Sequence, residues 1–276
     1  MNKYTSHIDA HLEIKKKNFS EMMDKIFAQN KHKFLTNIKE WKNVLSKLKL
    51  LNIIVISAIH LGALYSLFSL DLTINIKTIL WCLFICLVQA IGVTAGAHRL
   101  WTHRTYKAKL PLKIILLICY AVGNQIPLHS WVRDHRIHHK CMDTDADPHN
   151  SNRGFFFSHV GWLLVKKKSE VINEGRQIDL TDLDTDPILV FYDKYFWIFS
   201  TTFCHIIPIT IPVYMWHEAW TNSIKIDLFR IAFGLNAVWS VNSFAHMWGT
   251  KPYNMNINPT DNSVVSFFSY GEGWHN

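Results

Sequence analysis

The sequence predicts an all-α membrane protein whose four transmembrane helices form two hairpins. Hydrophobic residues make up 49% of its 276 residues, and they are gathered into long blocks rather than spread along the chain. An uncharged block of about 20 residues can cross the roughly 30 Å hydrocarbon layer of a bilayer as a helix. This uneven distribution of apolar residues excludes an ordinary soluble enzyme.

Four blocks are long enough to cross the bilayer. Three of them carry no charge, and the fourth is more polar because Asp227 and Arg230 lie near its start. The short segment DLTINIK joins the first two blocks and HEAWTNSIK joins the last two, which predicts two helical hairpins. The expected spans are residues 50–70, 78–97, 195–216 and 226–248.

A fifth apolar stretch, Leu110 to Pro127, is not expected to cross. It has about 18 residues, contains Lys113 and carries a proline near each end. If it crossed, the histidines before it and after it would lie on opposite sides of the membrane and could not share a site. We therefore expect a helix at the membrane surface or packed within the polar part of the protein.

The basic residues predict the orientation of the chain. Residues 1–49 contain 11 of the 29 lysines and arginines and residues 98–194 contain 14, whereas the two short loops hold only Lys77 and Lys225. Because basic residues near spans stay on the cytoplasmic side, both termini and the middle region should be cytosolic. Residues 1–49 are read as a tail with no cleavable signal peptide. The net charge of +8 suits membrane lipid or an anionic substrate, and nucleic acid is a poor partner because spans divide the basic residues.

Histidine is the residue type that indicates a functional site. The stretch DHRIHHK places three histidines where one helix would bring them onto a single face. Four more lie on the same predicted side of the membrane, so the seven together exceed what one ion accepts and predict two metals, of iron, zinc or copper. Each histidine alone could be an ordinary surface or helix-end residue. The seven are His98, His103, His135, His138, His139, His246 and His275.

The five cysteines, at 82, 86, 119, 141 and 204, show no paired C-x-x-C spacing. A disulfide framework or a thiolate metal site is therefore not expected.

Several segments together resemble the membrane fatty acyl-CoA desaturases of the stearoyl-CoA type, from about Asn52 to the end of the chain. They are GAHRLWTHRTYK, WVRDHRIHHK, DADPHNSNRGFFFSHVGWLL, NSFAHMWGTKPY and GEGWHN. The resemblance implies a desaturase domain over residues 50–276, with four transmembrane helices in the endoplasmic reticulum membrane and a cytosolic helical cap formed by residues 98–194 and 249–276. The cap would hold two irons. The implied reaction introduces a cis double bond into a long-chain fatty acyl-CoA, with dioxygen and two electrons from a cytochrome b5-type donor.

The resemblance also assigns ligands. The seven histidines match metal-ligand positions, and Asn242, one helical turn before His246, matches an asparagine that acts through water. The family's last box continues with two further histidines, whereas this chain stops at Asn276, so two expected ligands and the following cytosolic region are absent. Because every earlier box is intact, we expect a fragment rather than a protein that has lost its chemistry. The chain as it stands should show little or no desaturation.

Substrate contacts follow from the same resemblance. Gln125, Trp131 and Trp239 match residues of a bent acyl tunnel, although tryptophan near a membrane interface is also common in packing. Five residues match family positions that contact the CoA group: Asn52, Arg133, Asp134, Lys166 and Lys167. The three lysines at 166–168 could equally be solvent-exposed residues near lipid head groups.

The far end of the tunnel is assigned to one helix face. Cys86, Ala90 and Thr94 step back from His98 at four-residue intervals, so they share a face. In the resembling family this face closes the acyl tunnel, and small residues there leave room for long chains. Close packing of helices through small residues is an equally good explanation. The other histidines, at 7, 11, 32, 60, 129, 149, 159, 205 and 217, match no ligand position.

Three alternatives remain open at this point. One is a membrane lipid hydroxylase, or a desaturase acting on a lipid with another carrier; another is an inactive fragment or pseudo-enzyme. The third, of a different class, is a metal- or haem-binding transporter in which His60, His205 and Asn236 line a pathway within the membrane. A transporter would place its ligands at mid-membrane depth, whereas the histidine motifs lie at one face.

Overall fold

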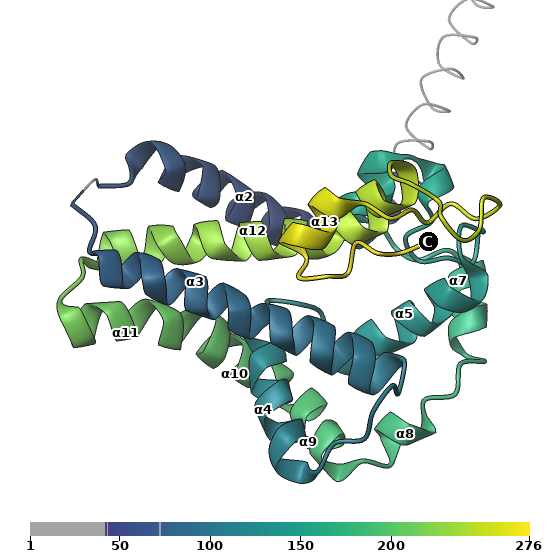
Figure 1. Ribbon diagram of the computed structural model, residues 1–276, viewed down its shortest axis with the longest axis horizontal. Helices are drawn as coiled ribbons and strands as arrows, with labels where there is room; N and C mark the ends of the chain where they lie inside the picture. The colour runs from purple at the N-terminus through teal and green to yellow at the C-terminus, as the bar shows by residue number, and fades with distance from the viewer. Residues whose placement is uncertain (1–41, 43, 72) are drawn as a thin grey trace, which may run out of the picture. The chain divides into compact units, whose positions relative to one another are not determined.

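The computed structural model describes residues 42, 44–71 and 73–276 (Figure 1). The chain divides into two compact units, Met1–Leu48 and Lys49–Asn276. The tail expected over residues 1–49 lies almost wholly outside the described residues. The following paragraphs describe the second unit.

The described residues of this unit form helices and no strand, which confirms the predicted fold class. Two isolated β-bridges, Thr250–Asp261 and Asp261–Trp274, occur in the C-terminal part of this unit. The helices are α2 (Leu50–Ser69), α3 (Ile76–Ile91), η1 (Gly92–Thr102), α4 (Leu110–Ala121), α5 (Leu128–Cys141), η2 (Ser151–Arg153), η3 (Phe157–Gly161), α6 (Trp162–Leu164), α7 (Ser169–Gly175), α8 (Thr181–Asp184), α9 (Pro187–Lys194), α10 (Phe196–Ser200), η4 (Thr201–Ile206), α11 (Ile207–Trp216), α12 (Trp220–Met247) and α13 (Ser263–Phe268).

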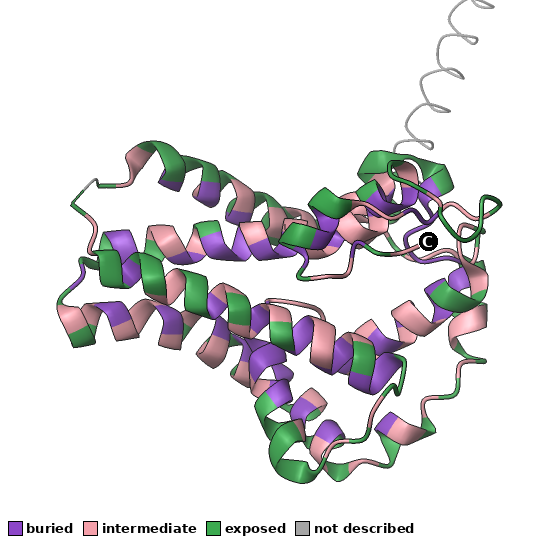
Figure 2. Ribbon diagram, viewed as in Figure 1, coloured by how far each residue is buried: buried purple, intermediate pink, exposed green. Residues whose placement is uncertain are grey.

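Within the described residues, three helical segments are long and apolar enough to cross a membrane: Leu50–Ser69, Ile76–Thr102 and Phe196–Trp216. Large apolar side chains such as Leu61, Phe68 and Leu83 are exposed on these helices. Figure 2 colours several stretches of the α2 and α3 ribbons as exposed. Apolar side chains in such numbers are stable on an outer surface that meets lipid. The protein is a helical membrane protein.

Helix α12 lies among these segments, beside α2, α3 and α11 (Figure 1). Its 28 residues span about 42 Å. Its polar residues point inward: the Arg230 guanidinium is 1% exposed and donates to Asp227 Oδ1 at 2.8 Å, to Gln89 Oε1 at 3.1 Å and to the Cys204 carbonyl at 2.7 Å. The lower hydropathy of this segment thus comes from a satisfied internal network rather than from contact with water.

The two short connecting loops meet at one end of the unit. Glu218, in the loop between α11 and α12, accepts hydrogen bonds from the Asn75 amide at 3.0 Å and the Thr78 hydroxyl at 2.6 Å, both at the start of α3. The Lys225 ammonium also donates to the Ser69 carbonyl at the end of α2. Both hairpins therefore turn at the same end.

Helix α4 is too short to span. Its 12 residues extend about 18 Å, against the roughly 30 Å of hydrocarbon. It packs on the junction of α3 and η1, where a Cβ on Gly92 would lie 2.2 Å from the Cys119 carbonyl carbon. Only glycine permits this approach of two backbones. The expectation that residues 110–127 do not cross therefore agrees with the structure.

The second and third apolar segments contain π-helical turns that the sequence did not predict. Segment η1 follows α3 without a break, so this helix continues to Thr102 instead of ending at the expected residue 97. Its i→i+5 hydrogen bonds include His103 N to His98 O at 3.0 Å. π-helical turns occur frequently at functional sites.

Two groups of buried apolar residues hold the unit together. One joins η1, α4, α5, α8, α9 and α10 through residues such as Trp101, Tyr120 and Tyr192. The other joins α2, η4 and α12 through Ile59, Cys204 and Trp239. The first group supports the segments that carry the histidine motifs.

Candidate metal centre and substrate cavity

Four of the predicted ligands form one group, called here the four-histidine cluster: His98 in η1, His103 directly after η1, and His135 and His139 in α5. One ligand atom of each lies within 4.8 Å of the others. The Nε2 atoms of His135 and His139 are 3.1 Å apart. Two lone pairs can approach this closely around a shared cation.

The π-helix explains how η1 presents two histidines together. Residues five apart on an α-helix are rotated by about 140° from one another, so they would point apart. The i→i+5 bonding of η1 places His103 one turn beyond His98, and their ring centroids are 4.6 Å apart.

Three other predicted ligands form the three-histidine cluster: His138 from α5, His246 from α12 and His275 from the C-terminal segment. The ring centroid of His246 lies 5.1 Å from that of His138 and 5.1 Å from that of His275. Asn242 is one turn before His246 and lines a cavity together with His275. The seven predicted histidines therefore lie in two groups, and Asn242 lines the cavity beside them.

Three carboxylates that were not predicted from the sequence lie close to the Nδ1 atoms of these rings. Asp147 Oδ2 lies 2.9 Å from His138 Nδ1, and Asp143 Oδ2 lies 3.4 Å from His246 Nδ1. Glu272 Oε2 lies 2.7 Å from His98 Nδ1. An Nδ1 proton held by a carboxylate leaves the Nε2 lone pair free to face a metal ion.

His149 is another residue near the clusters that was not among the predicted ligands. It was not predicted to bind metal, yet its ring centroid is 4.2 Å from that of His138, and it forms a further candidate group with His138 and Asp147. Its Nδ1 is buried and has no hydrogen-bond partner within the described residues. The acidic segment DTDADPHN, which contains His149 and begins two residues after the DHRIHHK motif, was the sequence feature that could have indicated this role.

Burial favours the neutral state in three of these rings. It is the largest cause that lowers the pKa of His139 to about 3, and the neighbouring His138 and His103 add to it. Burial likewise holds the pKa values of His135 and His275 well below the usual range. Unprotonated imidazole is the form that binds metals, so these three rings are in the state that binding requires near neutral pH.

These donors fit metal ions. The Nε2 atom of His246 is buried in the three-histidine cluster and makes no hydrogen bond in the described part of the chain. A buried polar atom without a partner is costly unless something else satisfies it. A metal ion bound by nitrogen ligands, of the kind that imidazole suits, would do so.

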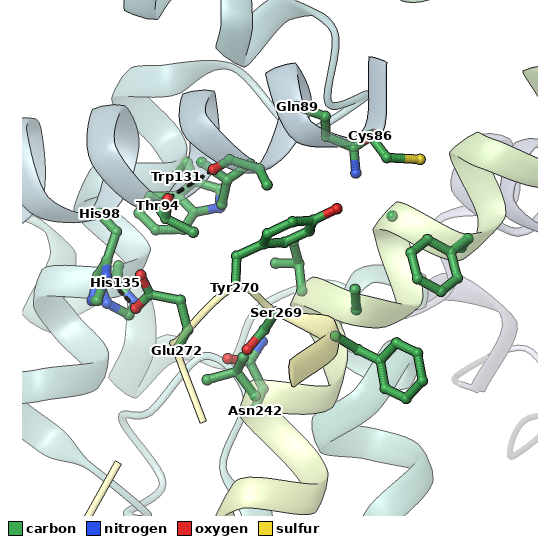
Figure 3. Close-up of a pocket in the computed structure, with 18 of the residues that line it drawn as sticks. Cys86, Gln89, Thr94, His98, Trp131, His135, Asn242, Ser269, Tyr270 and Glu272 are labelled. Carbon is green, nitrogen blue, oxygen red and sulfur yellow. Dashed lines mark hydrogen bonds and ion pairs between the residues drawn. The ribbon is translucent and has the colours of Figure 1, made fainter. Parts of the chain in front are cut away.

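A cavity leads from the histidines into the membrane part of the protein (Figure 3). Cys86, Ala90, Thr94 and His98 all line it from one face of α3 and η1, as predicted for a shared helix face. The Thr94 hydroxyl donates back to the Ala90 carbonyl at 2.9 Å, so the hydroxyl is satisfied within the helix. The opposite wall comes from α12, α13 and the segment after it, including Tyr270.

A second cavity collects other predicted substrate residues. Asn52, Gln125, Trp131 and Trp239 line it, and Trp131 also lines the first cavity. The Asn52 amide donates to the Leu163 carbonyl at 2.8 Å. Trp131 thus lines both cavities, and its ring stacks on that of His135, with the centroids 4.9 Å apart.

The fatty acid desaturase profile matches residues 75–276, which is more than half of the chain. The chain belongs to the fatty acid desaturase family. Over 226 residues it is 50% identical to the acyl-CoA Delta-9 desaturase of Acheta domesticus and 50% identical to the stearoyl-CoA desaturase of Bos taurus. Over 225 residues it is 49% identical to the acyl-CoA Delta(11) desaturase of Trichoplusia ni.

These matches cover 82% of this chain. They cover 63% of the Acheta and Bos proteins and 64% of the Trichoplusia protein, so the chain spans a little under two thirds of the length of these relatives.

In this member of the desaturase family, three of the residues predicted to meet CoA are in contact. Asp134 Oδ1 accepts from the Lys167 ammonium and lies 3.4 Å from Arg133 Nε. Asp134 Oδ2 is buried without a partner in the described residues. Lys166 is exposed beside this group, and Asn52 lies in the second cavity rather than in it.

Two of the polar residues that a transporter would use to line its pathway, His60 and Asn236, contact each other instead. Asn236 Nδ2 and Oδ1 lie 2.9 Å from His60 Nε2 and 3.0 Å from His159 Nε2. His205 lies apart from them, with Nδ1 3.6 Å from Asp227. These contacts satisfy the side chains within the helix bundle, and membership of the desaturase family removes the reason to assume a transport pathway.

Proposed function

We propose that the protein is an acyl-CoA desaturase that introduces a cis double bond into a long-chain saturated fatty acyl-CoA. The observation that carries the proposal is the two histidine clusters at one end of a cavity that enters the membrane part of the fold. Relatives that are named acyl-CoA and stearoyl-CoA desaturases support the substrate class. A hydroxylase, or a desaturase that acts on a lipid with another carrier, would use the same metal donors. Its reaction product would distinguish it from the proposed enzyme.

In this proposal the two clusters hold two irons. Iron, when bound, activates dioxygen for hydrogen removal from unactivated methylene groups, which side-chain acids and bases cannot achieve. The chain's own residues prepare the site: Asp147, Asp143 and Glu272 orient histidine rings through Nδ1, and burial keeps imidazoles unprotonated. Asn242 would contribute to the metal site through a bridging water molecule.

The proposed acyl path runs from the second cavity past Trp131 into the first. Gln125, Trp131 and Trp239 would bend the chain beside the clusters, and Cys86 and Ala90 would close the far end. Such a path excludes water and fixes which C–C bond lies near the metals. The CoA phosphates would meet Arg133, Lys166 and Lys167, with Asp134 and Asn52 contacting the rest of the group.

We propose four spans, with α12 as the fourth, both termini in the cytosol and residence in the endoplasmic reticulum membrane. The internal pairing of Asp227 with Arg230 supports α12 as a spanning helix, because it removes the cost of placing unpaired charges in lipid. Residues 50–276 would then form the desaturase domain, with the cap from 98–194 and 249–276. A cytochrome b5-type protein would supply two electrons on the cytosolic side.

Glycosylation mapping tests this topology. Acceptor sites engineered into both short loops, near Lys77 and near Lys225, are expected to be modified, because the loops would face the lumen. An acceptor near Arg153, with the same spacing from the membrane, should stay unmodified. Glycosylation of the acceptor near Arg153 would contradict the proposed orientation of the chain in the membrane.

The proposed activity is tested by expressing the full-length protein in desaturase-deficient cells and analysing their fatty acids by gas chromatography. We expect a new monounsaturated acid. A hydroxylated product, or a product attached only to another carrier, would replace the proposal with the corresponding alternative.

A further inference from the structure

Asp182 lies outside both histidine clusters, yet it is bonded to two arginines that each follow a predicted metal ligand. Arg104 comes directly after His103 at the end of η1, and Arg136 comes directly after His135 on α5. The sequence reasoning gave none of these three residues a role.

The Asp182 carboxylate binds both guanidinium groups through paired contacts. Arg104 donates from Nε to Oδ2 at 3.0 Å and from Nη2 to Oδ1 at 2.6 Å. Arg136 donates from Nη1 to Oδ1 at 3.0 Å and from Nη2 to Oδ2 at 2.8 Å. Paired contacts of this kind fix orientation as well as distance.

Arg136 also reaches the histidine-bearing segment itself. Its Nη2 donates to the Trp101 carbonyl at 2.7 Å, between His98 and His103, and its Nη1 donates to the Asp179 carbonyl at 2.6 Å. The Arg136 side chain is 12% exposed, so water competes little with these bonds. Arg136 therefore links α5 directly to η1.

The backbone of Arg104 gives an independent indication. Its φ is +53°, in the left-handed region that favours glycine and small polar residues. The bulky arginine here extends its side chain to Asp182. Asp182 itself is fixed by the next residue, Leu183, which is 3% exposed in the core of the cap.

We propose that Asp182 is a positioning residue that sets the register between η1 and α5, and through it the geometry of the four-histidine cluster. That cluster takes two ligands from each segment, so a shift between the segments changes all four positions. The three-histidine cluster takes only His138 from α5 and none from η1. Loss of Asp182 should therefore weaken one metal site and spare the other. The inference rests on the proposed metal function of the clusters.

Cobalt(II) titration of the chelator-treated, full-length protein in detergent, followed by its visible absorption, tests the inference. In Asp182→Ala we expect two binding steps with one weakened by roughly 10- to 100-fold, the range that supporting residues of metal sites show. The remaining step should be lost when His246→Ala is added. Asp182→Glu should restore part of the affinity.

Asp184→Ala is the matched control, because this carboxylate lies on the same helix α8 and pairs only with the His129 ring, at 3.0 Å, in the contacts of the described residues. It should bind both cobalt ions as the unmodified protein does. Thermal unfolding of the metal-free proteins shows whether a variant has lost stability. It therefore distinguishes misplaced ligands from a destabilised fold as the cause of weaker binding.

Three results would overturn the inference. One is unchanged affinity at both sites in Asp182→Ala, and another is equal weakening of both sites together with a large loss of metal-free stability. The third is an unmodified protein that binds no cobalt, which would overturn the proposed metal function as well.

Discussion

His138→Ala is expected to abolish the unsaturated product and to lower the iron content of the protein. The His138 side chain is 2% exposed, its ring centroid lies 5.1 Å from that of His246, and its Nδ1 lies 2.9 Å from Asp147 Oδ2. Alanine removes a ligand and takes from the buried Asp147 carboxylate one of its partners, while the Asp143 and His149 amides still donate to it. The lost ligand should prevent stable metal binding in this cluster.

His129→Ala provides the control for this variant. His129 lies on the same helix, α5, but its side chain is 34% exposed and pairs with Asp184 at the surface. The control should keep its iron and its product. A full iron complement and normal turnover in His138→Ala would refute the assignment of this residue.

Cys86→Trp is expected to shift substrate preference to shorter acyl chains. The unmodified cavity, with Cys86 and Ala90 at its end, should accept chains of about sixteen to eighteen carbons. An indole at position 86 would fill the space that the last methylene groups occupy. Ala90→Trp, one turn closer to the histidines, should shorten the accepted chain further.

Leu87→Trp is the matched control, because Leu87 is next in sequence but 45% exposed on the outward apolar face of α3. It should leave the chain-length profile unchanged. Products are measured by gas chromatography after feeding saturated acids of graded length. If the Cys86 and Ala90 variants keep their iron and their profile, this face does not line the tunnel.

Three of the four predicted spans and the histidine motifs were predictable because their signals are local. An apolar block of the right length and a histidine spacing can be read from a few consecutive residues, and the shortness of the 110–127 stretch followed from its prolines. The π-helix of η1 could not be predicted in this way. Its first residue, Gly92, packs against α4, and a contact between segments that are separate in the sequence cannot be read from local spacing.

The supporting residues were missed for the same reason. Asp143, Asp147 and Glu272 are ordinary acidic residues in the sequence, and only the fold brings them to the Nδ1 atoms of ligand histidines. His149 was set aside because it matched no ligand position, yet the structure places it against His138. The polarity of α12 likewise becomes intelligible only when Arg230 is seen bonded to Asp227 and Gln89.

The central claim is that the histidines form two sites for iron. X-ray absorption at the iron edge, combined with the iron content of the purified full-length protein, tests it most directly. The account predicts two irons per chain with nitrogen ligands from imidazole and no thiolate ligand. A single iron, or none, or a spectrum dominated by sulfur ligands would contradict it.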